Sequence, residues 1–127
     1  MRYWTFDVVQ LIADYPKNRK TLSAIEVELA TTRKFVADPV AGTDKGDWEV
    51  LEKILELREA EYEMYCGMVR LGLDDLPEVE RLVLQWWLID RYEDDYIAEH
   101  LDIANLEELK KIKKIAITKF TNIVMPN

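Results

Sequence analysis

The sequence has very little cysteine and histidine. Its 127 residues include one cysteine, Cys66, and one histidine, His100. A single cysteine excludes an intrachain disulfide, and one thiol with one imidazole is too small a set for a zinc or thiolate cluster. A single histidine also leaves little from which to build a nucleophilic catalytic site. These absences disfavour most metal-dependent and covalent enzyme classes, and we expect no metal, no cofactor and no enzymatic activity.

Long apolar runs are also missing. No stretch approaches the roughly 18 consecutive apolar residues of a membrane span. The first ten residues, MRYWTFDVVQ, do not have the form of a signal peptide. Hydrophobic residues nevertheless make up 49% of the chain and charged residues 33%, a balance that favours a folded core over disorder. We therefore expect a cytoplasmic protein without a membrane partner.

The charge is unevenly distributed along a chain whose formal net charge is -8. Residues 1–34 carry six Lys or Arg and four Asp or Glu, a net +2. Residues 35–104 carry six against nineteen, a net -13, and residues 105–127 carry five against two, a net +3. An acidic protein with a basic end is unsuited to indiscriminate polyanion binding, but it permits a local contact with phosphates.

Helical periodicity dominates and strand alternation is scarce, which predicts an all-α fold, a helical bundle. We divide the chain into an N-terminal helical hairpin (1–35), a loop (36–47), a long central helix (48–73) and a C-terminal module (74–127), together forming one compact domain. Pro16 is expected to stop the first helix. Asp47 is a candidate N-cap of the central helix, and Gly72 is its expected end.

The central helix has one apolar stripe and one acidic face. The acidic face is interpreted as a solvated surface. The stripe can serve either as core or as the seam of a homodimer, and at about three heptads it is too short to identify as a coiled coil. Its members are Leu51, Ile54, Arg58, Tyr62, Tyr65 and Val69.

The last third of the sequence reads as a long helix, a very short helix, a turn of about four residues (DIAN) and a long basic helix. This is the order of a helix-turn-helix. Ala98 provides the small side chain needed where two helices cross closely, and Asp94 or Asp95 caps the short helix. The expected helix-turn-helix core is Ile97, Ala98, Leu101, Ile103, Leu109, Ile112 and Ala116.

Four lysines fall within five positions near the start of the last helix. At about 100° per residue, Lys110, Lys111 and Lys114 occupy the arc opposite the apolar side chains. That arc would face a DNA groove, where lysines contact phosphates. Asn105 is a candidate N-cap. The predicted DNA-binding residues are Asn105, Lys110, Lys111, Lys113, Lys114 and Thr118, although a lysine-rich helix face can also be a plain solvated surface.

Two segments resemble a known family. LIADYPKNRKTLSAIEVEL near the start is similar to the opening of phage transcriptional activators of the ArpU and RinA type. LPEVERLVLQWWLIDRYEDDYIAEHLDIANLEELKKIKKIAITKF resembles their C-terminal half, which is itself like region four of bacterial sigma factors. The resemblance implies a phage or prophage transcriptional regulator that binds promoter DNA through a sigma-like helix-turn-helix spanning residues 83–119. Its implied partners are duplex DNA and RNA polymerase.

Two alternatives remain open. The net charge of -13 over residues 35–104 suits an acidic protein-binding module that docks onto a host nucleic-acid-binding protein and modulates it. An enzyme would require a buried pair of carboxylates, and Asp44, Asp47 and Glu49 in the loop are the only loose candidates for one.

Overall fold

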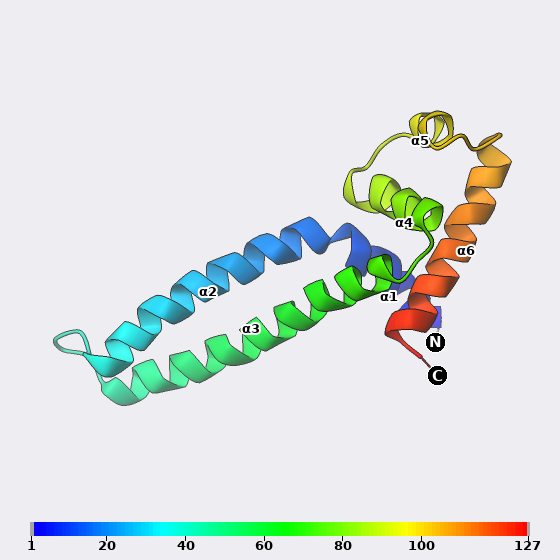
Figure 1. The fold of residues 1–127 in the computed structure, drawn as a ribbon. Coiled ribbons are helices and arrows are strands. Elements are labelled where there is room, and N and C mark those ends of the chain that lie inside the picture. The colour runs from blue at the N-terminus through cyan, green and yellow to red at the C-terminus, as the bar shows by residue number, and fades with distance from the viewer. Residues whose placement is uncertain (1, 127) are drawn as a thin grey trace. The chain divides into compact units, whose positions relative to one another are not determined.

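The computed structural model describes residues 2–126, with side chains from Val8 onward. Within this range the chain is helical and contains no β-strand, which confirms the all-α prediction. The elements are α1 (Arg2–Ala13), α2 (Tyr15–Ala37), α3 (Lys45–Asp74), α4 (Glu78–Leu84), a π-helical turn η1 (Gln85–Ile89), α5 (Asp94–His100) and α6 (Leu106–Val124) (Figure 1). No helix in the described range combines the length and apolarity that crossing a membrane requires.

The chain forms two compact units. One combines residues 1–16 with residues 67–127, and the other contains residues 17–66. The expected division at residues 35, 47 and 73 was placed at the predicted ends of helices. The observed units are instead defined by which helical segments pack together, and both α2 and α3 cross the border between them.

The first unit has its main core between helices from the two ends of the chain. α1 and α4 both pack on α6, and α1 also packs on η1. The buried side chains of this cluster are Val8, Ile12, Val69, Leu73, Leu76, Leu84, Leu88, Ala116, Ile117 and Phe120. Gly72 does not end α3, which continues to Asp74. Instead, a Cβ atom at Gly72 would overlap the ring of Phe120. This glycine is therefore explained by close packing and not by helix termination.

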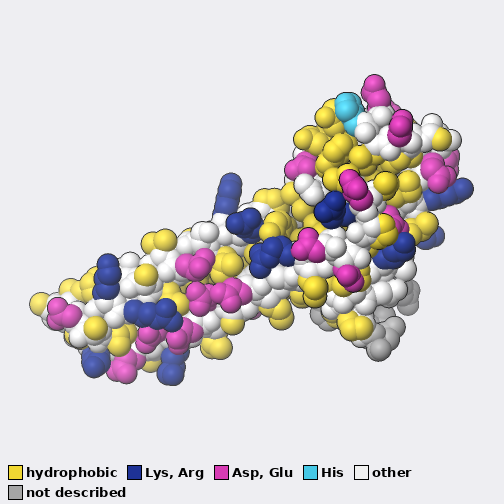
Figure 2. All heavy atoms as spheres, in the orientation of Figure 1, with side chains coloured by type: hydrophobic (Ala, Val, Ile, Leu, Met, Phe, Trp, Pro, Cys, Tyr) yellow, Lys and Arg dark blue, Asp and Glu magenta, His cyan; other side chains and the backbone are white. Residues whose placement is uncertain are grey.

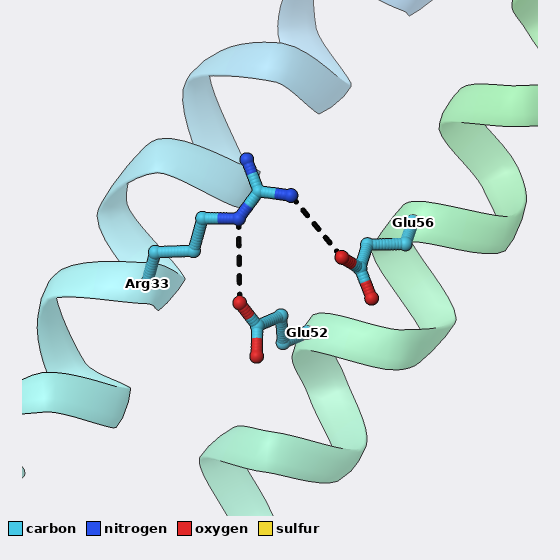
Figure 3. Close-up of polar contacts among 3 residues, drawn as sticks. All are labelled: Arg33, Glu52 and Glu56. Atoms are coloured by element: carbon cyan, nitrogen blue, oxygen red, sulfur yellow. Dashed lines mark hydrogen bonds and ion pairs between the residues drawn. The ribbon is translucent and has the colours of Figure 1, made fainter.

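The second unit is a hairpin of α2 and α3, joined by the loop at residues 38–44 (Figure 1). Its apolar core consists of Ile25, Leu29 and Leu55, with Tyr62 partly buried against them. Arg33 on α2 contacts two carboxylates of α3, with Nε 3.3 Å from Glu52 Oε2 and Nη2 3.2 Å from Glu56 Oε2 (Figure 3). The hydrogen bond to Glu56, with further contributions from Glu52, raises the pKa of the Arg33 guanidinium.

Two local expectations for these helices were wrong, and a third was only partly right. Pro16 does not stop a helix: α1 ends at Ala13 and Pro16 lies in the first turn of α2, where its missing N–H is not needed. Asp47 is not the N-cap of α3. That place belongs to Asp44, whose Oδ1 accepts a hydrogen bond from Gly46 N at 2.8 Å, while Asp47 lies within the first turn.

The third concerns the apolar stripe of α3. Leu51, Ile54 and Arg58 are exposed, whereas Val69 is buried and Tyr62 is partly buried, as the stripe predicted. The buried face also includes Leu55 and Cys66, which the predicted stripe left out. α3 has apolar side chains on opposite sides, so periodicity identified the helix without identifying which side packs on α2.

Candidate nucleic-acid interface

A second apolar cluster of the first unit lies beneath α5 and the beginning of α6. Val83, Ile97, Ala98 and Leu109 are buried in it, with Trp86, Trp87, Leu101, Ile103 and Ile112 partly buried around them. Six of the seven side chains predicted as the core of this region are therefore brought together. The seventh, Ala116, belongs to the main core of the first unit instead. α6 is long enough to contribute side chains to both clusters.

The turn between α5 and α6 has a defined backbone geometry. Asp102 has a φ of 58°, Asp102 N donates to Glu99 O at 3.4 Å, and Ile103 N donates to Ala98 O at 2.9 Å. This pair of hydrogen bonds with a left-handed residue is the Schellman arrangement for ending a helix. It turns the side chain of Ile103 back onto the cluster that holds Ala98. The turn thus fixes the direction in which the chain enters α6.

Asn105 begins α6, as predicted. Its Oδ1 accepts a hydrogen bond from Glu108 N at 2.8 Å, which satisfies one of the free amides of the first turn. The Asn105 side chain is exposed, but its oxygen is already occupied by this cap.

Two of the five lysines of α6 are held by carboxylates. Lys113 Nζ lies 2.7 Å from Asp94 Oδ1 and 4.5 Å from the centre of the Trp87 ring, and 16% of its side chain is exposed. Lys119 Nζ lies 2.9 Å from Glu80 Oε1. Lys113 is thus largely buried and paired with a carboxylate, unlike the exposed lysines with which it was predicted.

The expected role of Asp94 and Asp95 as caps of α5 was wrong. The N-cap residue is Glu93, without a side-chain cap hydrogen bond. Asp94 and Asp95 occupy the first turn, where a carboxylate still interacts favourably with the helix dipole. Asp94 additionally holds Lys113, so it ties α5 to α6.

The other three lysines, Lys110, Lys111 and Lys114, are exposed on the outer side of α6. None of them takes part in an ion pair that the described residues form. Thr118 is exposed on the same side and donates its hydroxyl hydrogen to Lys114 O at 3.0 Å. An open groove of about 740 Å³ runs beside this face. Its lining comprises Trp87, Asp94, Leu106, Glu107, Lys110, Lys113, Lys114, Ile117 and Thr118.

An aromatic surface that combines α5 with Tyr92 and Trp86 before it was not predicted from the sequence. The rings of Tyr92 and Tyr96 are 4.7 Å apart, Trp86 lies 5.7 Å from Tyr92, and His100 stacks on Tyr96 at 3.9 Å. Tyr92 and Tyr96 remain 42% and 41% exposed. Figure 2 shows the single histidine beside hydrophobic side chains, with acidic side chains nearby. The four-residue spacing of Tyr92, Tyr96 and His100 was the available signal.

The acidic loop residues considered as enzymatic candidates do not form a buried pair. Asp44, Asp47 and Glu49 are all exposed at the start of α3, and Asp44 is engaged in the cap described above. Within residues 2–126 there is no group of three or more His, Cys, Asp or Glu side chains arranged to hold a metal ion.

Comparison of the chain with protein-family models, with curated proteins and with solved structures gives no match.

Proposed function

We propose that α5, the following turn and α6 act as a sigma-like helix-turn-helix, and that the protein is a phage or prophage transcriptional regulator of the ArpU/RinA type that binds promoter DNA. The observation that carries this proposal is the division of the α6 lysines. Lys113 and Lys119 are held by carboxylates, whereas Lys110, Lys111 and Lys114 project from one side of the helix. Three uncompensated cations on the exposed side of a firmly packed helix suit contact with phosphates.

In this proposal the protein binds and positions, and it performs no chemical step. α6 enters the major groove with its exposed side, and the Schellman turn and the Asp94–Lys113 contact hold α5 against it. Lys110, Lys111 and Lys114 contact phosphates, and Thr118 reaches the backbone or a base edge. α6 contains no arginine, so the commonest bidentate contact to guanine is missing and lysine or threonine must supply any base recognition.

Carboxylates around the lysines set the expected strength of binding. Glu107 lines the groove, Asp94 lies at its side, and the whole chain carries a net charge of -8. DNA binding should therefore be weak at moderate salt and should strengthen steeply as salt is lowered. For three neutralised phosphates, the slope of log K against log salt is expected to be about -3.

The experiment that tests the proposal is fluorescence anisotropy with labelled promoter-containing duplex DNA across a salt series. The variant Lys110→Ala/Lys111→Ala/Lys114→Ala should lose most of the affinity, and its salt slope should approach zero. A matched control is Lys17→Ala/Lys20→Ala/Lys34→Ala, which removes three exposed lysines from α2. The control changes the net charge equally and should retain most of the affinity. Equal losses in both variants would contradict the proposed role of α6.

The aromatic surface favours a second candidate function, that of an acidic protein-binding module acting on a host nucleic-acid-binding protein. The rings of Tyr92 and Tyr96 are exposed, and the same segment of sequence carries three exposed carboxylates, Glu93, Asp95 and Glu99. Aromatic faces and carboxylates together suit arginine side chains, through cation–π contact and ion pairing.

Binding to a basic, arginine-containing protein surface distinguishes the two functions. Tyr96→Ala should weaken such binding roughly fivefold through the lost cation–π contact, whereas the α6 triple-lysine variant should leave it unchanged. Isothermal titration against an arginine-rich peptide measures both. If Tyr96→Ala has no effect and the α6 variant abolishes DNA binding, the DNA-binding proposal alone survives.

A further inference from the structure

The side of α3 that faces away from α2 carries large exposed hydrophobic side chains. Val50 is 59% exposed, Ile54 49%, Leu57 73% and Met64 54%. Together with Glu61 they follow one another at alternating intervals of four and three residues. We call these five residues the outer stripe. In Figure 2, hydrophobic side chains appear along the edge of the hairpin where α3 runs.

The hairpin has a small apolar core and large exposed apolar side chains. Its core contains Ile25, Leu29 and Leu55, with Tyr62 partly buried, whereas the outer stripe exposes four large apolar side chains. A helix with apolar residues on one side gains most of its stability by covering that side. Contiguous exposed hydrophobic surface of this kind commonly marks an interface.

The spacing of the outer stripe identifies the kind of partner. Intervals of four and three residues form a heptad pattern, in which Ile54 and Glu61 are a positions and Val50, Leu57 and Met64 are d positions. Such a seam fits another helix with the same pattern, and a second copy of α3 supplies one. A two-fold symmetric pairing of identical surfaces is also the commonest form of protein assembly.

The charges on and beside the stripe favour one orientation of the two copies over the other. In a parallel pair, Glu61 would face Glu61 of the second copy, and Lys53 at a g position would approach Arg58 at the second copy's e position. Both contacts are between like charges. In an antiparallel pair, Ile54 can face the second copy's Met64 and Leu57 can face the second copy's Glu61. Each Glu61 then lies beside an Arg58 of opposite charge.

We propose that the outer stripe is the interface of a homodimer in which two α3 helices pair antiparallel. α3 has 30 residues and is about 45 Å long, so a single helix pair covers an area at the low end for specific interfaces. The dimer should therefore have micromolar affinity and depend on protein concentration. This interface is a separate property from DNA binding, and either can fail without the other.

Sedimentation velocity of the full chain from roughly 1 to 200 µM tests the proposal. The wild-type protein should shift from the 15.0 kDa species towards twice that mass. Leu57→Glu should raise the dissociation constant by roughly 30-fold or more, because it places a charge in the centre of the seam. Val27→Glu is the matched control, since Val27 is an equally exposed valine on α2, at 68%, outside the stripe. It should sediment as wild type.

Circular dichroism shows whether each variant keeps its helix content, so that loss of the dimer is not mistaken for unfolding. Disulfide trapping in a Cys66→Ala background tests the orientation. A mixture of Ile54→Cys and Met64→Cys proteins should form a mixed disulfide, and neither variant should cross-link to itself.

A monomer at every concentration, or identical sedimentation of Leu57→Glu and wild type, would overturn the proposal. In that case the outer stripe would be expected to bind a helix of a different protein. Self-cross-linking of Ile54→Cys would overturn the antiparallel orientation.

Discussion

Two glycines of α3 have opposite surroundings. A Cβ atom at Gly72 would overlap the ring of Phe120, which is fully buried, whereas a Cβ atom at Gly67 would meet no other atom within 4 Å. Glycine in the interior of a helix destabilises the helix relative to alanine, because glycine loses more backbone conformational freedom on folding. The residue at position 72 therefore reflects a requirement for space that outweighs helix propensity.

Gly72→Ala should lower the free energy of unfolding by about 1–3 kcal/mol, because Phe120 must leave its position to accommodate the methyl group. Gly67→Ala should instead raise it by up to about 1 kcal/mol, through helix propensity. Urea denaturation followed by circular dichroism measures both changes. If Gly72→Ala were as stable as Gly67→Ala, the packing against Phe120 would not be as close as the structure indicates.

Asp102 occupies a left-handed backbone conformation in the turn before α6, with a φ of 58°. Asp102→Gly should leave stability unchanged or raise it by up to about 1 kcal/mol, whereas Asp102→Val should lower it by about 1–2 kcal/mol, since a β-branched residue resists positive φ. Thermal unfolding distinguishes the two substitutions. A valine variant with wild-type stability would show that the turn readily adopts another conformation.

At the scale of the element, α6 combines a structural and a proposed binding role along one helix. The Asp94 carboxylate removes Lys113 from the set of cations that face solvent. Asp94→Asn should therefore free Lys113 and remove a negative charge from the groove. On the proposed function, DNA affinity at low salt should rise by about three- to tenfold, and the salt slope should steepen by about one.

The matched control for Asp94→Asn is Glu80→Gln. It changes the net charge by the same amount and frees Lys119, which does not line the groove beside Lys110 and Lys114. Its effect on anisotropy with duplex DNA should be smaller. Equal gains from the two substitutions would indicate a response to net charge alone.

The helices themselves could be predicted from sequence, but not every contact they make. Leu109 and Ala116 of α6 were predicted as core residues, and both are buried. The π-helical turn at Gln85–Ile89 was not foreseen, because Trp86 and Trp87 fit an ordinary helix equally well by periodicity. In the structure both are partly buried: Trp86 joins the cluster beneath α5, and Trp87 contributes to both clusters.

At the scale of the whole molecule, the two units differ in how much core they contain. Among the side chains that the structure describes, the main core of the first unit contains ten that are buried, whereas the hairpin core contains three. Backbone amides in the hairpin part of α2 should therefore exchange with deuterium faster than amides in α6. Exchange measured by mass spectrometry at two protein concentrations provides the test. The proposed dimer should slow the exchange of α3 amides at the higher concentration. Equal exchange rates in the hairpin and in α6 would contradict the difference between the units.

The division into units could not be read from sequence for a physical reason. Helix ends are marked locally by residues such as Asp44 and Asn105, but the choice of partner depends on side chains that are distant in sequence. In α3, Leu55 and Leu57 are equally apolar and two positions apart. Only packing reveals that Leu55 is buried while Leu57 is 73% exposed. The predicted stripe on this helix was only partly right for the same reason: Val69 is buried, but Leu51 and Ile54 are exposed.

The α1–α6 core also has a consequence for protein synthesis. Ile12 and Phe120 belong to one buried cluster although they lie near opposite ends of the sequence. While the ribosome is still translating the middle of the chain, α1 has no partner for its apolar side, whereas α2 and α3 are neighbours in sequence and can pair at once. Contacts between distant segments form slowly, and unfinished ones leave hydrophobic surface open to aggregation. α1 should thus be the part of the nascent protein that depends most on chaperone protection until α6 emerges.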